Sequence, residues 1–331
     1  MNRTSALGIA VAALLAGSAA PAPVAYSVVI HGGTIYDGSG GNPFVGDVAL
    51  RGDRIVYVGP HAPGRAALVI DAQGKAVSPG FINMLSWAVE SLIADGRGMS
   101  DTYQGVTLEV FGEGDSMGPL TPHMKALALK REGDIKYPIS WTTLAQYLEY
   151  LQHKGVTPNV ASFVGATTVR VHELGEKDVQ PTPAQLQRMR ALVRQAMRNG
   201  ALGVGSALIY APATYARTPE LTALASEAGK CGGSYISHMR SEGNKVLEAT
   251  DELIRISRDS GAPAQIYHFK QAGQANWPKI GPMIAKVNAA RAAGLKISAN
   301  MYTYTAGATG LDAAMPTWVQ SGGLEAWIAR M

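Results

Sequence analysis

Two histidines end short apolar runs that the sequence predicts to be β-strands. His238 closes the run 233–238, and His268 closes the run 263–268. Segment 244–257 between them has the apolar spacing of an amphipathic helix. In a parallel sheet or barrel, the carboxyl ends of neighbouring strands lie at the end that binds ligands. Two neutral imidazoles there can share one metal ion, although each can also be an ordinary buried histidine bonded to backbone.

A lysine follows the second histidine at a spacing that bears on the same site. Lys270 lies two residues beyond His268, and side chains alternate between the two faces of a strand. We therefore expect Lys270 on the face that carries His268, where its ammonium group adds a fixed positive charge beside the imidazoles.

The elements that must position these side chains alternate between strand and helix. This pattern predicts an α/β fold, a TIM-like (β/α)8 barrel over residues 77–331. Seven strands are expected, one fewer than a complete barrel has, at 77–83, 106–111, 160–164, 203–209, 233–238, 264–268 and 296–302. The clearest helices are expected at 183–199, 220–230, 244–259 and 278–293. Residues 26–76 instead read as short strands separated by Gly, Asp and Pro turns, and so as a small β domain.

The first 25 residues have the pattern of a secretory signal peptide. Arg3 precedes the apolar run 6–17, and small residues up to Ala25 suit cleavage. This pattern predicts export to a periplasm or to the medium without a stable membrane anchor. A net charge of +4 and the absence of a dense basic cluster argue against nucleic-acid binding. Cys231 is the only cysteine, so an intrachain disulfide is excluded.

Several motifs resemble those of one enzyme family. They are IHGGTIYDG at 30–38, VID at 69–71, SPGFIN at 78–83, GALGVGS at 200–206, LIYAP at 208–212, SHMRSE at 237–242, HFK at 268–270 and YTYTAGATG at 302–310. Together they resemble the metal-dependent amidohydrolase superfamily, and in particular its D-aminoacylase (N-acyl-D-amino-acid deacylase) branch. The resemblance implies a barrel that carries zinc. It also implies that residues 26–76 are the N-terminal part of a small β-sandwich domain.

The resemblance assigns roles to individual side chains. His238 and His268 match the zinc-binding histidines, and Lys270 matches the lysine that holds the substrate carboxylate. The tyrosines that assist this lysine fall on Tyr210 and on Tyr302 or Tyr304, and Arg240 is also expected to contact substrate. Without the resemblance, the three tyrosines would read as core or rim aromatics.

The chain also departs from the family pattern at three places. Leu85 and Trp87 stand where a His-x-His pair is expected, and neither can bind zinc, so we expect at most one tightly bound ion. Gly114 stands on the position of a cysteine ligand, which leaves the neighbouring Glu113 as the candidate third ligand or as a loop carboxylate paired with a cation. The catalytic aspartate of the family is expected beyond Met331, so we interpret the chain as part of a longer protein.

For the longer parent protein, the resemblance and these observations predict zinc-dependent hydrolysis of the amide bond of N-acyl (D-)amino acids, small-molecule substrates with a free carboxylate. A zinc ion beside the amide carbonyl and a lysine on the carboxylate suit such a substrate. Two alternatives remain at this level. One is another amidohydrolase reaction, on dipeptides or cyclic amides, and the other is a non-catalytic binding protein on a degenerate barrel.

Overall fold

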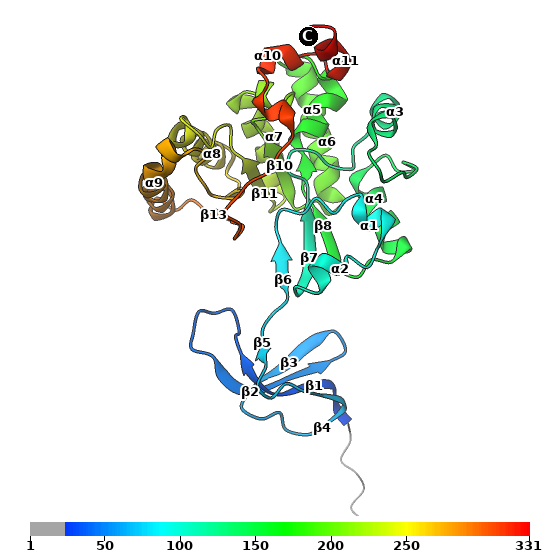
Figure 1. The fold of residues 1–331 in the computed structure, drawn as a ribbon, viewed down its shortest axis with the longest axis vertical. Coiled ribbons are helices and arrows are strands. Elements are labelled where there is room, and N and C mark those ends of the chain that lie inside the picture. Colours follow the sequence, from blue (N-terminus) through cyan, green and yellow to red (C-terminus); the bar gives the residue numbers. More distant parts are fainter. Residues whose placement is uncertain (1–23) are drawn as a thin grey trace, which may run out of the picture. The chain divides into compact units, whose positions relative to one another are not determined.

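Residues 24–331 are described by a computed structural model, in which the chain divides after Pro79 into two units (Figure 1). The predicted signal peptide lies almost entirely outside the described residues. Within 24–331, none of the helices combines the length and the apolar character needed to cross a bilayer.

The smaller unit is a sheet built around one long strand, β1 (Val24–Ile35). Its order is β3-β2-β1-β4, with β1 antiparallel to β2 and parallel to β4, and a short fifth strand also pairs with β1. The other strands are β2 (Phe44–Arg51), β3 (Arg54–Gly59), β4 (Arg65–Asp71) and β5 (Ala76–Val77). The small core consists of Tyr26, Val29, Ala49 and Ala62. The all-β character expected for this region is therefore present.

The larger unit contains two parallel sheets whose hydrogen bonding runs from one into the next. Their orders are β6-β7-β8 and β13-β12-β11-β10-β9. The strands are β6 (Phe81–Asn83), β7 (Val106–Phe111), β8 (Asn159–Ser162), β9 (Val164–Gly165), β10 (Gly203–Ala207), β11 (Ser234–His238), β12 (Ala264–Ile266) and β13 (Ile297–Ala299). Only Phe163 separates β8 from β9, and its N–H donates to the Phe111 carbonyl. The parallel α/β architecture is confirmed, although the described strands form no closed barrel.

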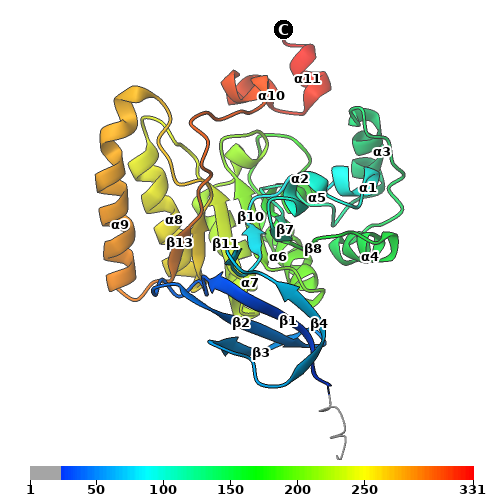
Figure 2. The same ribbon diagram turned by 60° about the horizontal axis from the view of Figure 1, so that its bottom comes forward.

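Helices cover the outer face of these sheets. Helix α7 packs on β10 and β11, α8 on β12, and α9 on β13 (Figure 2). The helices are α1 (Ser91–Ala94), α2 (Met99–Thr102), α3 (Pro122–Arg131), α4 (Leu144–Lys154), α5 (Ala166–Leu174), α6 (Pro183–Arg198), α7 (Thr218–Lys230), α8 (Val246–Ser260), α9 (Ile280–Ala292), α10 (Thr317–Gln320) and α11 (Leu324–Ile328). Three 3-10 turns lie at Ala213–Tyr215, Gln274–Lys279 and Leu311–Ala314.

Some element boundaries differ from the sequence expectation. The strand expected at 77–83 is divided, because Ala76–Val77 pairs with β1 of the small unit while Phe81–Asn83 pairs with β7. Strand β12 ends at Ile266, two residues before His268. Helix α8 begins without a side-chain cap, and Gly261 ends it in the left-handed conformation. The sequence therefore predicted the order of these elements more accurately than it predicted their first and last residues.

The strands of the larger unit bury different side chains on their two faces. Val110, Phe163, Ile236 and Tyr267 form an inner cluster. Their neighbours on the opposite face, among them Phe111, Val164, Val204, Tyr235 and Ile266, belong to the main core under the helices. This alternation is the period-2 pattern of a sheet that is covered on both faces. It aims every second side chain at the inner space where the strands end.

One buried carboxylate ties helix α6 to helix α7 and makes stability depend on pH. Glu227 is 2% exposed and pairs with Arg190, Arg194 and Lys230 at 2.5–3.1 Å. Burial alone would raise the pKa of Glu227, but its hydrogen bonds to Lys230 and the arginines hold that pKa at about 2. A carboxyl whose pKa is depressed on folding stabilises the fold above its unfolded pKa and loses this contribution as pH falls.

Replacing Glu227 by glutamine should therefore lower the free energy of unfolding at pH 7 by about 1–2 kcal/mol, a value discounted for the solvent exposure of the cations. The difference between the variant and the original protein should shrink as pH falls from about 4.5 towards 2. Urea unfolding at pH 7 and pH 3 measures it. An equal loss at both pH values would show that packing, not charge, is responsible.

Candidate metal centre

Glu113, His238 and His268 meet in the inner space at the carboxyl ends of their strands. All three are buried. His238 Nδ1 lies 3.0 Å from Glu113 Oε1 and 3.0 Å from His268 Nε2, and His268 Nε2 lies 3.3 Å from Glu113 Oε1. The structure therefore brings together the two histidines and the carboxylate that the sequence proposed, although they come from positions up to 155 residues apart.

Two glycines let Glu113 reach this position after β7. Gly112 and Gly114 both have positive φ, 105° and 79°. A Cβ at Gly112 would lie 2.5 Å from the Phe163 carbonyl oxygen, and one at Gly114 would lie 2.8 Å from the Ala207 Cβ. A side chain at Gly112 would push the loop away from Phe163, and one at Gly114 would push it away from β10. The two glycines beside Glu113 therefore allow its carboxylate to lie buried in the inner space.

His238 is placed by regular strand geometry. It is the last residue of β11 and lies opposite Ala207 of β10 in parallel register. Ile236, two residues earlier, belongs to the inner cluster, so alternation turns His238 inwards as well. The ring of Tyr210 stands edge-on to its imidazole, with 5.4 Å between centroids.

His268 is placed by a local deviation from strand geometry. It is the only non-glycine residue with positive φ in the described part of the chain, at 36°. Its N–H donates to Asn300 Oδ1 at 2.6 Å, which holds the turn in place. A left-handed conformation costs a residue with a side chain roughly 1–2 kcal/mol, and such strain concentrates at functional sites. The turn brings the imidazole to 4.4 Å from that of His238, between ring centroids.

Burial and hydrogen bonding act in opposite directions on the pKa values in this cluster. Burial raises the pKa of the Glu113 carboxyl, but the hydrogen bonds with His238 and His268 outweigh it and lower that pKa to about 2. Burial lowers the pKa of the His268 imidazole, but the interactions with Glu113 and Glu242 raise it by more, so the net shift of that pKa is upward. Glu113 is therefore ionised, as a carboxylate ligand must be.

Glu242 is a member of the site that sequence reasoning missed. Its Oε1 atom lies 2.7 Å from His268 Nδ1, 3.7 Å from His238 Nε2 and 2.8 Å from Lys270 Nζ. Lys270 is thus beside the histidines as expected, but the reason differs. The strand ends before His268, so the carboxylate of Glu242, and not strand alternation, holds the lysine there. Its place four residues after His238 in the SHMRSE motif was the available signal.

Leu85 and Trp87 have separate roles where a His-x-His pair was expected. Leu85 packs against the inner cluster around Val110 and Ile236. Trp87 is 63% exposed, yet its indole N–H donates to Glu113 Oε2 at 2.9 Å. Because the indole nitrogen is only a donor, Trp87 holds the carboxylate from outside and leaves Oε1 facing the histidines.

The three tyrosines differ in how near they come to this cluster. Tyr210 contacts His238, and its hydroxyl bonds to Thr309 Oγ1 at 2.7 Å. Tyr302 lies 6.4 Å from His268 between ring centroids and 5.2 Å from Lys270 Nζ. Tyr304 is 76% exposed and contacts the site through the ring of Tyr302. Tyr210 and Tyr302 are therefore the better candidates for substrate contact.

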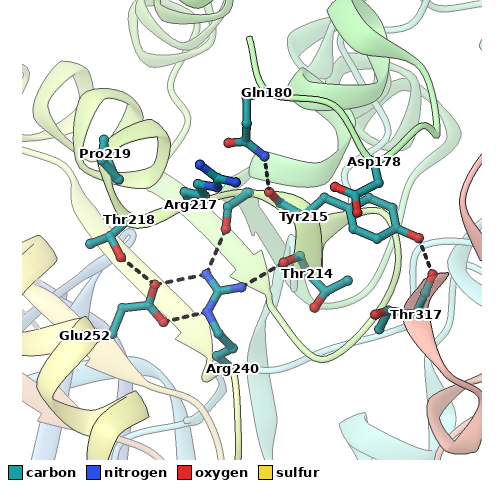
Figure 3. Close-up of a pocket in the computed structure, with 11 residues that line it drawn as sticks. Asp178, Gln180, Thr214, Tyr215, Arg217, Thr218, Pro219, Arg240, Glu252 and Thr317 are labelled. Atoms are coloured by element: carbon teal, nitrogen blue, oxygen red, sulfur yellow. Dashed lines mark hydrogen bonds and ion pairs between the residues drawn. The ribbon is translucent and has the colours of Figure 1, made fainter.

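Arg240 lies apart from the cluster, and the substrate contact expected for it stays a prediction. Its guanidinium donates to both oxygens of Glu252 and to the carbonyls of Thr214 and Ala216 (Figure 3). These contacts use four N–H bonds and help to line a separate open pocket of about 560 Å3 at the start of α7. Arg240 thus links the loop that contains Thr214 and Ala216 to α8, and Glu252 neutralises its charge.

The donor set and its spacing fit a metal ion. Glu113 Oε1, His238 Nδ1 and His268 Nε2 all lie within 4.8 Å of one another. Two ligands about 2.0–2.1 Å from a tetrahedral zinc ion are separated by roughly 3.3 Å, and the pairs here are separated by 3.0–3.3 Å. Two imidazoles and one carboxylate form a set that leaves a fourth position open.

Comparison with known proteins finds close relatives along most of the chain, whereas no family model matches it. The chain is 33% identical over 285 residues to an N-acyl-D-glutamate deacylase of Alcaligenes xylosoxydans xylosoxydans, covering 85% of this chain and 58% of the relative. It is 31% identical over 288 residues to a D-aminoacylase of the same organism, with coverage of 86% and 58%. The chain therefore spans a little over half the length of these curated relatives.

Solved structures give the same result. A D-aminoacylase crystal structure, described as defining a subset of amidohydrolases, matches with a TM-score of 0.77 at 33% identity, covering 85% of this chain and 59% of that one. An N-acyl-D-glutamate deacylase from Bordetella bronchiseptica, complexed with zinc and a phosphonate inhibitor, matches with a TM-score of 0.75 at 28% identity, with coverage of 84% and 59%. A further D-aminoacylase structure is described by its binuclear metal centre. Along most of its length the chain is therefore similar to D-aminoacylases and N-acyl-D-glutamate deacylases, which are amidohydrolases.

Proposed function

We propose that this site serves zinc-dependent hydrolysis of the amide bond of N-acyl D-amino acids, which releases the amino acid and a carboxylate. The observation that carries the proposal is the buried cluster of Glu113, His238 and His268 with Lys270 beside it. The names of the relatives support it, since they act on N-acyl-D-glutamate, on N-acyl-D-aspartate and as D-aminoacylases.

Each residue has a distinct task in this reaction. Zinc held by Glu113, His238 and His268 would polarise the amide carbonyl and lower the pKa of a water molecule. Lys270 supplies the positive charge for the substrate carboxylate, and Tyr210 and Tyr302 offer hydroxyl groups at the rim. Trp87 keeps Glu113 in one orientation. The acid–base aspartate expected beyond Met331 stays a prediction.

Hydrolysis itself is the direct test. The zinc-supplemented full-length protein, which includes the aspartate expected beyond Met331, should release amino acid from N-acetyl-D-glutamate, N-acetyl-D-aspartate or N-acetyl-D-leucine faster than from the L enantiomers. The Glu113→Gln variant, which keeps the shape of the side chain and removes its charge, is the control for release that does not depend on the site. Tight zinc binding without any release would favour the non-catalytic binding protein, and release only from dipeptides or cyclic amides would favour the other amidohydrolase reaction.

The number of metal ions provides a second test. We propose one tightly bound zinc, because Leu85 and Trp87 offer no ligand atom and Trp87 occupies the outer oxygen of Glu113. Elemental analysis after dialysis should therefore give about one zinc per chain. Two ions per chain would contradict this and would require ligands outside the three named here.

We also propose that the protein is exported. This rests on the signal-peptide pattern of residues 1–25, which lies almost wholly outside the described residues. Expression in a Gram-negative host should yield a processed chain in the periplasmic fraction, with an N-terminus between residues 21 and 26. An unprocessed chain that stays in the cytoplasmic fraction would refute export.

A further inference from the structure

We propose that Glu242 is a positioning residue that couples the metal ion to the carboxylate-binding lysine. This inference rests on the proposed function and deepens it. One carboxylate oxygen, Oε1, contacts both arms of the site, at 2.7 Å from His268 Nδ1 and 2.8 Å from Lys270 Nζ. The Glu242 side chain is only 11% exposed, so water screens these contacts weakly.

The first arm of the proposal concerns the histidines. The nitrogens that face Glu113 are His238 Nδ1 and His268 Nε2, and a metal ion needs a free lone pair on each. Glu242 lies against the opposite nitrogens, His268 Nδ1 and His238 Nε2. These two outer nitrogens are buried and form no hydrogen bond in the described structure, so Glu242 acts on them through its charge at short range. That charge favours the proton on the outer nitrogen and so leaves the inner one unprotonated. Such outer partners of metal-binding histidines also fix the orientation of the ring.

The second arm concerns Lys270. Without a metal ion, the two carboxylates and the ammonium group give the cluster one negative charge, with the imidazoles neutral. A divalent ion changes this to one positive charge, and a substrate carboxylate then brings it to zero. Glu242 is therefore needed for the metal ion but competes with the substrate for Lys270. Removing the charge of Glu242 should therefore weaken zinc binding and strengthen the binding of a carboxylate by Lys270.

The Glu242→Gln variant tests the first arm by zinc affinity, measured by competition with a chelating dye. We expect its zinc dissociation constant to rise about ten- to a hundredfold. Lys270→Met should leave zinc affinity unchanged or raise it. The loss caused by Glu242→Gln should persist in the Lys270→Met background, because it acts through His268. Its disappearance in the double variant would show that Glu242 serves only the lysine and would overturn the proposal, as would unchanged zinc affinity in the single variant.

Acetate binding to the zinc-saturated protein tests the second arm. Titration calorimetry, with acetamide as the uncharged blank, should show acetate bound about three- to tenfold more tightly by Glu242→Gln than by the original protein. The Glu242→Gln/Lys270→Met double variant should lose this gain. A purely structural role would weaken both zinc and acetate, and that result would overturn the proposal.

Two controls separate this inference from other causes of failure. Thermal unfolding of the metal-free variants shows whether they fold. Should Glu242→Gln lower the unfolding midpoint, Glu242→Asp is measured instead, with the same expected loss of zinc affinity, because its carboxylate is one methylene too short to reach both arms. Failure of the original protein to bind zinc would refute the proposed function itself, whereas normal zinc binding with an unaffected Glu242 variant would refute only the coupling.

Discussion

Replacing His238 by alanine should weaken zinc binding by two to three orders of magnitude. Structural zinc sites with four protein ligands contribute about 10–16 kcal/mol in total, so one ligand accounts for roughly 2.5–4 kcal/mol. Removal of His238 also leaves Glu113 buried beside one imidazole and Trp87 only. Zinc affinity from dye competition measures the loss, and release of amino acid from the N-acyl substrates should fall with it.

The control for this prediction is another histidine of the larger unit. His123 lies exposed on α3, and its replacement by alanine should change neither zinc affinity nor hydrolysis. A His238→Ala protein that binds zinc as tightly as the original would show that the cluster of Glu113, His238 and His268 is not the metal centre. It would also remove the basis of the proposed reaction.

Replacing Lys270 by methionine should impair capture of the substrate carboxylate about ten- to a hundredfold in kcat/KM. This is the effect of losing a charge-assisted contact, roughly 1.5–3 kcal/mol. Methionine retains most of the side-chain length, and the ammonium group is the only charge removed. The ratio of kcat/KM between an N-acyl amino acid and its C-terminal amide is the measurement, because it isolates the carboxylate. That ratio should fall towards one in the variant.

The matched control for Lys270 is Lys286, which pairs with Asp251 on the outer surface of α8 and α9. Lys286→Met should leave the ratio unchanged. If Lys270→Met also preserves the preference for a free carboxylate, the lysine does not hold the substrate. The metal centre would stand in that case, but the substrate class would have to be sought among amides without a carboxylate.

Much of the candidate site was predictable from sequence because it depends on local periodicity. His238 ends an apolar strand, and alternation alone turns it to the inner face with Ile236. By contrast, the close approach of Gly112 to Phe163 and of Gly114 to Ala207, which lets Glu113 reach the site, emerges only from the structure. The parallel α/β order followed from the repeated strand and helix patterns, and it places the strand ends at one side of the sheet.

Other features depend on contacts between distant segments, which no local pattern contains. His268 reaches the centre only because Asn300, 32 residues later, stabilises its left-handed turn. The same holds for Trp87 on Glu113, 26 residues apart, and for Lys270 on Glu242, 28 residues apart. The partners of Arg240 were likewise not readable from its sequence neighbours, because Thr214, Ala216 and Glu252 lie on other elements.

Features of this protein that follow from local sequence and features that depend on tertiary contacts differ for a simple physical reason. The sequence by itself determined the alternating order of strands and helices and the inward direction of His238 at the end of β11, because hydrophobic burial with a period of two acts residue by residue. Only the tertiary structure decided which polar groups share a charge or a hydrogen bond. A buried carboxylate such as Glu242 takes whichever donors the packing brings within about 3 Å, and the packing joins residues that the sequence keeps far apart.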